Sequence, residues 1–248
     1  MKLIQNFNTF LVDTVNLNST RLGQLENSIE AIKTTVRGLD WKPTILGFAA
    51  QGSWVHKTII KPLPGDPFDA DLLVYVKPVA GWEAKDYING LYAEMGKLDR
   101  YRDKIRRYSH CITIEYAGER KIDVAPCVKE RVQVGTWEVC NRDTNAFERS
   151  NPLDYTDWLI ERNAISGSNN FRKATRLLKY LRDIKTNFTC PSFLLTTLLG
   201  MQIYESDKGT LGFADVPTTL KTLIGRLDDW LQANPSKPTV RNPVLFEE

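Results

Sequence analysis

The sequence predicts an α+β fold in which a sheet is followed by a helical second half. Short apolar runs of strand type recur between Thr44 and Val139, and turns rich in Gly and Pro separate them. After Asn151-Pro152 the apolar residues recur at helical spacing instead. We therefore expect two domains: a sheet-containing core with an N-terminal helix over residues 1–150, and a helical lobe over residues 151–248.

The composition is that of an ordinary globular protein. The 248 residues are 42% hydrophobic and 25% charged, and the net charge of +3 is too small by itself to imply nucleic-acid binding. The first ten residues lack the apolar stretch of a signal peptide, and no apolar run has the length of a membrane span. We therefore expect no membrane partner. Because the four cysteines form no Cys-x-x-Cys pair, we expect reduced thiols in a cytoplasmic protein.

One amphipathic helix is predicted before the sheet. Asn18-Ser19 is typical of a helix start, and Gly38 is typical of a stop. The apolar residues that recur at helical spacing between them are Leu22, Leu25, Ile29, Ile32 and Val36.

The stretch from Thr44 to Val76 predicts a strand, a tight turn, a short helix, a loop and a second strand. The turn is at Gly52-Ser53, where glycine lets the backbone turn sharply or approach a ligand. A backbone N–H and a hydroxyl at this turn suit phosphate groups.

Two carboxylates stand at the start of that second strand. Asp69 and Asp71 are two residues apart, so strand alternation puts them on the same side. Their charges repel unless a cation lies between them, and hard oxygen ligands suit Mg²⁺. We therefore predict a metal site at this strand end.

A third carboxylate lies inside another predicted strand. Ile112–Tyr116 and Arg120–Val124 are expected to form two strands joined by a turn at Ala117-Gly118, and the second strand contains Asp123. A charge inside an apolar strand is costly unless it is paired or bound to a metal. Three such carboxylates on adjacent strands could hold two divalent ions.

The rest of the first half contains a helix over Trp82–Lys97, a strand over Val132–Val139 and a polar connection over Asn141–Ser150. Between them the basic segment Lys97–Arg107 carries six Lys or Arg against two Asp. It fits either a solvated helix end or a surface for a regulatory polyanion such as RNA.

In the second half, helices are predicted over Tyr155–Arg162, over Phe171–Lys185, after Pro191 and over Val216–Leu231. The apolar stripe of the second helix comprises Phe171, Ala174, Leu178 and Leu181.

Four polar residues leave alternatives open. Lys179 is either a surface lysine or a contact for a triphosphate. Ser192 either caps its helix or donates to a phosphate. His56 and His110 are isolated in sequence, and we expect core or surface roles for both.

The ordered set of Gly52-Ser53, Asp69-x-Asp71 and Asp123 resembles the pattern of the polymerase-β-like nucleotidyltransferases. Nearly the whole chain resembles one branch, the bacterial cGAS/DncV-like nucleotidyltransferases with a SMODS-type domain, which are related to oligoadenylate synthetase. The segments that carry this resemblance are GFAAQGSWVHKTII, DADLLVYV, KIDVAPCV, DWLIERN, FRKATRLLKYLRD and PSFLLTTLLG. The resemblance implies a nucleotidyltransferase core with a mixed sheet, a helical second lobe, and an active site in the cleft between them.

The resemblance also implies roles for individual residues. The implied metal ligands and catalytic residues are Asp69, Asp71 and Asp123. The implied nucleotide-binding residues are Gln51, Gly52, Ser53, Lys179, Ser192 and Phe193. Among these, Lys179 and Ser192 would contact the donor triphosphate. Phe193 would stack on the donor base, with a place in the apolar core as the alternative.

The implied activity is the joining of nucleoside triphosphates, ATP and another, into a cyclic di- or trinucleotide second messenger with release of pyrophosphate. Two Mg²⁺ ions, replaceable by Mn²⁺, are the implied cofactors. The product would reach a downstream effector in anti-phage (CBASS) defence. The alternatives are a transferase acting on RNA or a small-molecule acceptor, and a catalytically silent nucleotide-binding module.

The C-terminus departs from the expected pattern. A further helix normally follows a stretch of this kind in relatives, whereas this sequence stops at Glu247-Glu248. The resemblance leaves open both a shorter member and a chain cut short at its C-terminus.

Overall fold

A computed structural model describes residues 3–117, 120–185, 187–236 and 238–245. The chain forms two compact units. The sheet unit comprises Asn18–Trp54 and Pro64–Asn151. The helical unit comprises Met1–Leu17, Val55–Leu63 and Pro152–Glu248.

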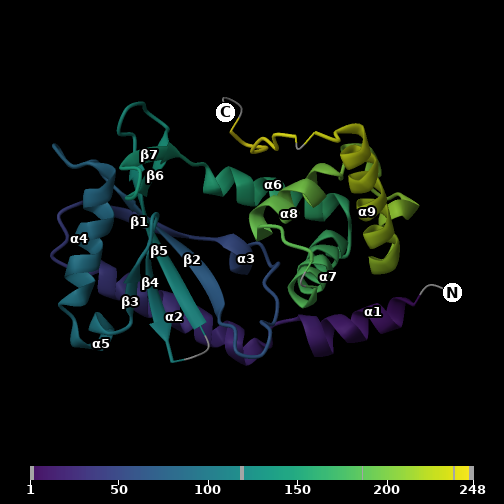
Figure 1. Cartoon of the computed structure of the whole chain (residues 1–248), viewed down its shortest axis with the longest axis horizontal. Helices are drawn as coiled ribbons and strands as arrows, with labels where there is room; N and C mark the ends of the chain where they lie inside the picture. Colours follow the sequence, from purple (N-terminus) through teal and green to yellow (C-terminus); the bar gives the residue numbers. More distant parts are fainter. Residues whose placement is uncertain (1–2, 118–119, 186, 237, 246–248) are drawn as a thin grey trace. The chain divides into compact units, whose positions relative to one another are not determined.

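The sheet unit is built on one mixed sheet of seven strands (Figure 1). The strands are β1 (Ile45–Gln51), β2 (Phe68–Val76), β3 (Ile105–Arg107), β4 (Ile112–Tyr116), β5 (Arg120–Lys129), β6 (Trp137–Asn141) and β7 (Ala146–Arg149). The order is β1-β2-β5-β4-β3, with β6 paired to β5 and β7 paired to β6. The central pair β2 and β5 is parallel, whereas the other pairs are antiparallel. The implied mixed sheet is thereby confirmed.

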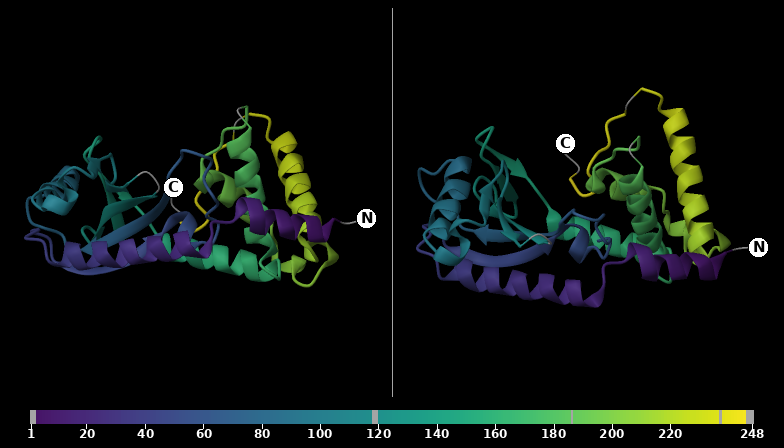
Figure 2. Two further views of the ribbon diagram at one scale, coloured as in Figure 1. Left: turned by 90° about the horizontal axis from the view of Figure 1, so that it is seen from below. Right: turned by 60° about the horizontal axis from the view of Figure 1, so that its bottom comes forward.

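The helices of this part of the chain are α2 (Ser19–Arg37), α3 (Gly52–Val55), α4 (Ala84–Gly96) and α5 (Asp99–Arg102). Helix α2 begins where the sequence predicts, because the Asn18 side chain accepts a hydrogen bond of 2.8 Å from the Arg21 N–H. It lies along one face of the sheet (Figure 2).

The two faces of the central strands differ in composition. On β2, the residues Ala70, Leu72, Val74 and Val76 alternate along one face and are buried. On β5, Arg120 also projects to this face, because its Nε donates to Ser28 Oγ of α2 at 3.0 Å. The opposite face of both strands begins with polar side chains and becomes apolar further along. Alternation along β2 and β5 therefore separates a helix side of the sheet from an open side.

The helical unit contains α1 (Ile4–Phe10), α6 (Pro152–Ile165), α7 (Asn170–Ile184), α8 (Ser192–Met201) and α9 (Val216–Ala233). Its main core is formed by apolar residues of α6, α7, α8 and α9, including Leu159, Phe171, Leu199 and Leu223. A second cluster joins Leu11 and Val15 to Ile60 and Leu177. The amphipathic patterns of these helices thus come together around two neighbouring apolar clusters.

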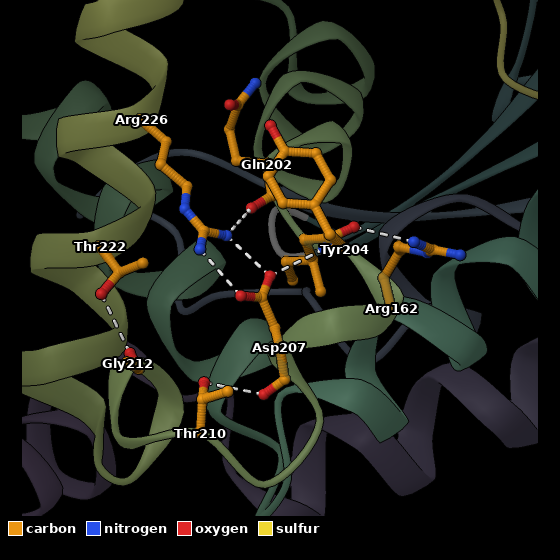
Figure 3. A network of polar contacts seen from close by, with 9 residues as sticks. Arg162, Gln202, Tyr204, Asp207, Thr210, Gly212, Thr222 and Arg226 are labelled. Atoms are coloured by element: carbon orange, nitrogen blue, oxygen red, sulfur yellow. Dashed lines mark hydrogen bonds and ion pairs between the residues drawn. The ribbon is translucent and has the colours of Figure 1, made fainter.

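A polar network ties α9 to the chain that follows α8 (Figure 3). The Arg226 guanidinium donates to both carboxylate oxygens of Asp207, at 2.7 and 2.8 Å, and to the Gln202 carbonyl at 2.7 Å. The Tyr204 N–H also donates to Asp207, at 2.8 Å. These bonds hold the pKa of the Asp207 carboxyl below its usual value, with the Arg226 hydrogen bonds as the largest cause.

Several sequence-based predictions were wrong in detail. The strand expected over Val132–Val139 is β6, at Trp137–Asn141, and the expected connection over Asn141–Ser150 contains β7. The residues around Val132 form a turn despite their strand propensity. Glu130 has φ 54° and Gly135 has φ 81°, and backbone in this region does not continue a strand. The basic segment Lys97–Arg107 extends beyond a helix end, since Lys97 caps the C-terminus of α4 and the segment then forms the short helix α5 and strand β3.

In α7, Leu181 is 41% exposed, so the buried stripe ends one turn earlier than expected. The turn residue Gly118 and the terminal Glu247-Glu248 lie outside the described residues.

All four cysteines are free thiols in this structure. Among the residues that the structure describes, no helix is both long enough and apolar enough to cross a membrane.

Candidate functional site

Three predicted carboxylates lie on the open side of the sheet, on its two central strands. In the parallel pair of β2 and β5, Asp71 lies directly opposite Asp123. Asp69 is one pleat away from Asp71 on the same side of β2. Asp69 is exposed, and the other two side chains are partly buried. We call this group the carboxylate edge, and parallel pairing explains how residues 69, 71 and 123 come together.

Gly52 lies against this edge and leaves no room for a side chain. It has φ 74°, and a Cβ atom added to it would lie 1.8 Å from Oδ2 of Asp71. The preceding residue, Gln51, ends β1 and pairs with Asp71 across the ladder, and Ser53 follows in α3. Both the positive φ and the close approach require glycine here, so the predicted turn Gly52-Ser53 adjoins the carboxylates.

The environment of Asp123 disfavours its charge. Burial raises the pKa of the Asp123 carboxyl, and the negative charge of Asp69 adds to that rise. The hydroxyl of Thr113 on β4 opposes this rise in pKa by donating to Oδ1 of Asp123 at 2.5 Å. Three carboxylates thus gather at an edge that is partly removed from water, and the Lys121 charge offsets the rise in the pKa of Asp123 only in part. Such a perturbed group is typical of ligand sites.

The carboxylate edge has the donor chemistry for a hard divalent ion, since its ligands would be carboxylate oxygens alone. Among the described residues, however, no group of three or more His, Cys, Asp or Glu side chains is arranged as a formed metal site. The Thr113 hydroxyl holds Oδ1 of Asp123 in place. The residue types and the strand register therefore fit Mg²⁺, while the side chains do not converge on one point.

A cavity of about 520 Å³ opens beside the carboxylate edge, entirely within the sheet unit. It is lined by Asp69, Asp123 and Thr113, and by the segment Tyr108–Cys111 before β4. In that segment His110 lies 3.0 Å from Glu148 and 2.8 Å from Ser109. The volume of this cavity is within the range of small-molecule sites, so the carboxylate edge faces a space that a ligand can enter.

The helical unit contains a second group of predicted residues, on α7. Lys179 is only 5% exposed, so the surface-lysine alternative is wrong. Its Nζ donates to the Thr58 carbonyl at 3.0 Å. A lysine with its stem and ammonium both enclosed is expensive to desolvate, and such residues commonly serve a ligand.

Two arginines that we did not single out share this face of α7. Arg172 and Arg176 precede Lys179 by seven and three residues, which is one stripe of a helix. Burial lowers the pKa of both guanidinium groups, and Arg176 Nε is buried without a hydrogen-bond partner among the described residues. We call these three residues the cation row. The helical spacing of these three cations was visible in the sequence FRKATRLLK. It was overlooked beside the apolar stripe of the same helix.

Ser192 and Phe193 open α8. Among the described residues no side chain caps this helix, and the Ser192 hydroxyl instead accepts from Arg182 at 2.9 Å, so the capping alternative is wrong. Phe193 is 53% exposed, so its place in the core is also wrong. Its ring lies 4.7 Å from that of Tyr155. An exposed ring supported by a second ring can offer a surface for a base.

A search of protein families matches residues 1–163 to the model described as "Second Messenger Oligonucleotide or Dinucleotide Synthetase domain". Among curated proteins, a c-di-GMP synthase from Roseivirga ehrenbergii is 23% identical over 283 residues. That alignment covers 98% of this chain and 73% of the synthase.

Solved structures show the same fold. The CD-NTase CdnG of Bradyrhizobium diazoefficiens, in complex with GTP, matches with a TM-score of 0.75 and 16% identity, over 97% of this chain and 81% of that one. The cyclic AMP-GMP synthase DncV of Vibrio cholerae, in complex with nonhydrolyzable GTP, matches with a TM-score of 0.71 and 16% identity, over 91% and 77%.

Proposed function

The chain belongs to the Second Messenger Oligonucleotide or Dinucleotide Synthetase family, which confirms its resemblance to the bacterial cGAS/DncV-like nucleotidyltransferases, and we propose that it makes a cyclic di- or trinucleotide from nucleoside triphosphates. The observation that carries this proposal is the register of β2 and β5, which places Asp71 opposite Asp123 with Asp69 one pleat away. A ribose hydroxyl attacks the α-phosphorus, a new phosphodiester bond forms, and pyrophosphate leaves. Further attacks of the same kind, one for each remaining nucleotide, complete the ring and release one pyrophosphate each.

We propose Asp69, Asp71 and Asp123 as the ligands of divalent metal ions, two Mg²⁺ in the simplest case. Bound there, such ions supply a lower pKa for an attacking hydroxyl and a counter-charge for the triphosphate. Asp123 would be the carboxylate nearest the attacking hydroxyl and would assist its deprotonation.

We propose that Gly52 and Ser53 bind phosphate oxygens through a backbone N–H and a hydroxyl. The lack of room for a Cβ at Gly52 supports this role, because only glycine brings the backbone this close to Asp71. The cavity beside Asp69 and Asp123 would admit the attacking hydroxyl of the acceptor nucleotide.

The cation row would neutralise triphosphate charge. Lys179 and Arg176 are partly or wholly removed from water, so a polyanion gains more from them than from solvated cations. Ser192 would add a hydroxyl contact, and the exposed ring of Phe193 would stack on the donor base.

Two other functions stay as alternatives. A transferase acting on RNA or a small-molecule acceptor would use the same carboxylates, and the family match argues against it. A silent nucleotide-binding module would need no metal ligands, and the presence of all three carboxylates argues against that reading. In the biological role that we propose, the product activates an effector in anti-phage defence.

The test is to incubate the purified chain with all four labelled nucleoside triphosphates and Mg²⁺ or Mn²⁺, and to resolve the products after phosphatase treatment. We expect a phosphatase-resistant product that requires no second substrate. The double variant Asp69→Asn/Asp71→Asn should make none. A product that appears only when RNA or a small acceptor is added would support the first alternative, and unchanged product from the double variant would contradict the proposed site.

A further inference from the structure

A second cavity lies on the helix side of the sheet, away from the carboxylate edge. Its volume is about 340 Å³, and it lies between α2, α5 and the paired ends of β4 and β5. Strand alternation separates the two cavities. On β5, Asp123 lines the first cavity whereas Arg120 lines the second. On β4, Thr113 and Tyr116 divide in the same way. We call it the helix-side cavity.

The charge of this cavity is all of one sign. Arg100, Lys104 and Arg120 line it, and no lining residue is a carboxylate. Within the described part of the chain, none of the three forms an ion pair with Asp or Glu. In the same basic segment, by contrast, Lys97 lies 2.6 Å from Glu94 and Arg102 lies 2.8 Å from Asp99. Lys97 and Arg102, which lie outside the cavity, are therefore paired with carboxylates, whereas the three cations that line it are not paired within the described residues.

The two arginines are held in place by aromatic and hydroxyl groups. The Arg100 guanidinium lies 4.7 Å from the ring centre of Tyr101, and that of Arg120 lies 4.7 Å from the ring centre of Tyr116. Arg100 also donates to the hydroxyl of Thr35. These contacts fix the position of each guanidinium without cancelling its charge, so less side-chain entropy is lost when a ligand binds.

The hydroxyl groups around the two arginines are neutral, so they do not neutralise the positive charge of the cavity. Tyr101 is buried, and its hydroxyl lies 3.3 Å from that of Thr35. Burial raises the pKa of Tyr116 to about 12, so this phenol stays neutral at physiological pH. Neutral hydroxyls beside fixed guanidinium groups are donors for the oxygen atoms of an anion.

We propose that the helix-side cavity binds a small, multiply charged phosphate compound, such as a free nucleotide or an inorganic oligophosphate. Paired guanidinium groups match the geometry of phosphate oxygens, and the volume is at the lower end of the range for small-molecule sites. A recess of this volume accommodates a small ligand, whereas a long polyanion would extend beyond it across the basic segment. This site is separate from the proposed catalytic one and does not depend on the proposed activity.

The test is a chemical footprint on Lys104, with inorganic tripolyphosphate as the probe. The full chain is acetylated with a limiting reagent in buffer containing EDTA, and the rate at each lysine is read by mass spectrometry. We expect tripolyphosphate to slow acetylation of Lys104 by roughly fivefold or more, because the bound ligand covers it. Lys97 is the internal control, since it lies in the same segment, outside the cavity, with 65% of its side chain exposed.

Two matched variants complete the test. Arg100→Ala should abolish the protection of Lys104, whereas Arg102→Ala, which removes the same charge from the same short helix outside the cavity, should leave it unchanged. No protection in the wild-type chain would overturn the proposal without any variant. Equal protection of Lys97 and Lys104, or protection by a long RNA but not by tripolyphosphate, would overturn it in favour of a polyanion on the exposed basic segment.

Discussion

Asp123 in the sheet unit and Asp207 in the helical unit are carboxylates in opposite environments. Asp207 receives two hydrogen bonds from Arg226 and one from the Tyr204 N–H, and these lower its pKa. Asp123 receives one from Thr113, while burial and the charge of Asp69 raise its pKa. The first carboxylate is satisfied within the chain, whereas the environment of the second is improved by a cation.

The difference separates charges that stabilise the fold from charges that prepare for a ligand. A buried charge with bidentate partners is costly to disturb, because its partner is left buried and alone. A group of carboxylates that repel one another lowers stability until a ligand binds. The cation row and the helix-side cavity show the same property with positive charge.

The largest effect is expected for Asp71→Asn, which keeps the shape of the side chain and removes its charge. Product formation should fall by roughly a thousandfold, since metal ligation is worth several kcal/mol in the transition state. The melting temperature should change little, because the side chain keeps its shape and volume. Asp99→Asn, at an exposed carboxylate paired with Arg102, is the matched control and should keep full activity. An equal loss of product formation in Asp71→Asn and Asp99→Asn would show that the carboxylate edge has no special role in catalysis.

For Asp207→Ala we expect a loss of stability without a loss of activity. This variant leaves the half-buried Arg226 without its partner and should lower the free energy of unfolding by about 3 kcal/mol. Urea unfolding measures that loss, and activity per folded molecule should be unchanged. Glu205→Ala removes an exposed carboxylate that lies 3.3 Å from Arg162, and it should cost far less. A similar cost in both variants would mean that the Asp207 network does not stabilise the fold.

A pH effect of intermediate size is expected from His56, which is 8% exposed beside Thr156. Burial, then the charges of Arg172 and Lys179, lower its pKa from 6.5 to about 4. Between those two values the unfolded chain binds the proton and the folded chain does not, so folding becomes less favourable as the pH falls. The difference in unfolding free energy between pH 7 and pH 5 should be about 2 kcal/mol from this group.

The control for this prediction is His56→Gln, which cannot take up a proton. The variant should lose that part of the pH dependence and keep the rest. The same slope in the wild type and the variant would show that other groups cause it.

The smallest effect is expected for Arg102→Ala. Its ion pair with Asp99 is 2.8 Å long, and both side chains are largely exposed, at 60% and 90%. An exposed pair of this kind contributes little, so the change in unfolding free energy should stay under about 0.5 kcal/mol. A loss as large as that of Asp207→Ala would show that burial does not decide which pairs matter.

The sequence was most informative where residue spacing alone determines geometry. The start of α2 at Asn18, the strands at Ile112 and Arg120, and the shared side of Asp69 and Asp71 followed from capping and alternation. The close approach of Gly52 to a carboxylate was expected only as a general property of glycine. The partner itself, Asp71, appears only in the structure, because it depends on the register of β1 and β2.

Features that depend on contacts between distant segments were not predictable. The burial of Lys179 depends on Thr58, more than a hundred residues away along the chain. Strand β7 was missed because its sequence, AFER, is short and polar, and pairing with β6 decides its conformation. The helix-side cavity was visible only as an excess of basic residues, since nothing in the sequence shows which of them the chain neutralises.

The central claim is that the carboxylate edge holds divalent ions, and Mn²⁺ binding measured by electron paramagnetic resonance tests it most directly. The titration compares the wild-type chain, Asp69→Asn/Asp71→Asn and Asp99→Asn, each with a nonhydrolysable nucleoside triphosphate analogue. We predict that the wild type and Asp99→Asn bind Mn²⁺ beyond what the free analogue binds, and that the double variant does not. Equal binding in all three proteins would contradict the account, because the ions would then lie elsewhere.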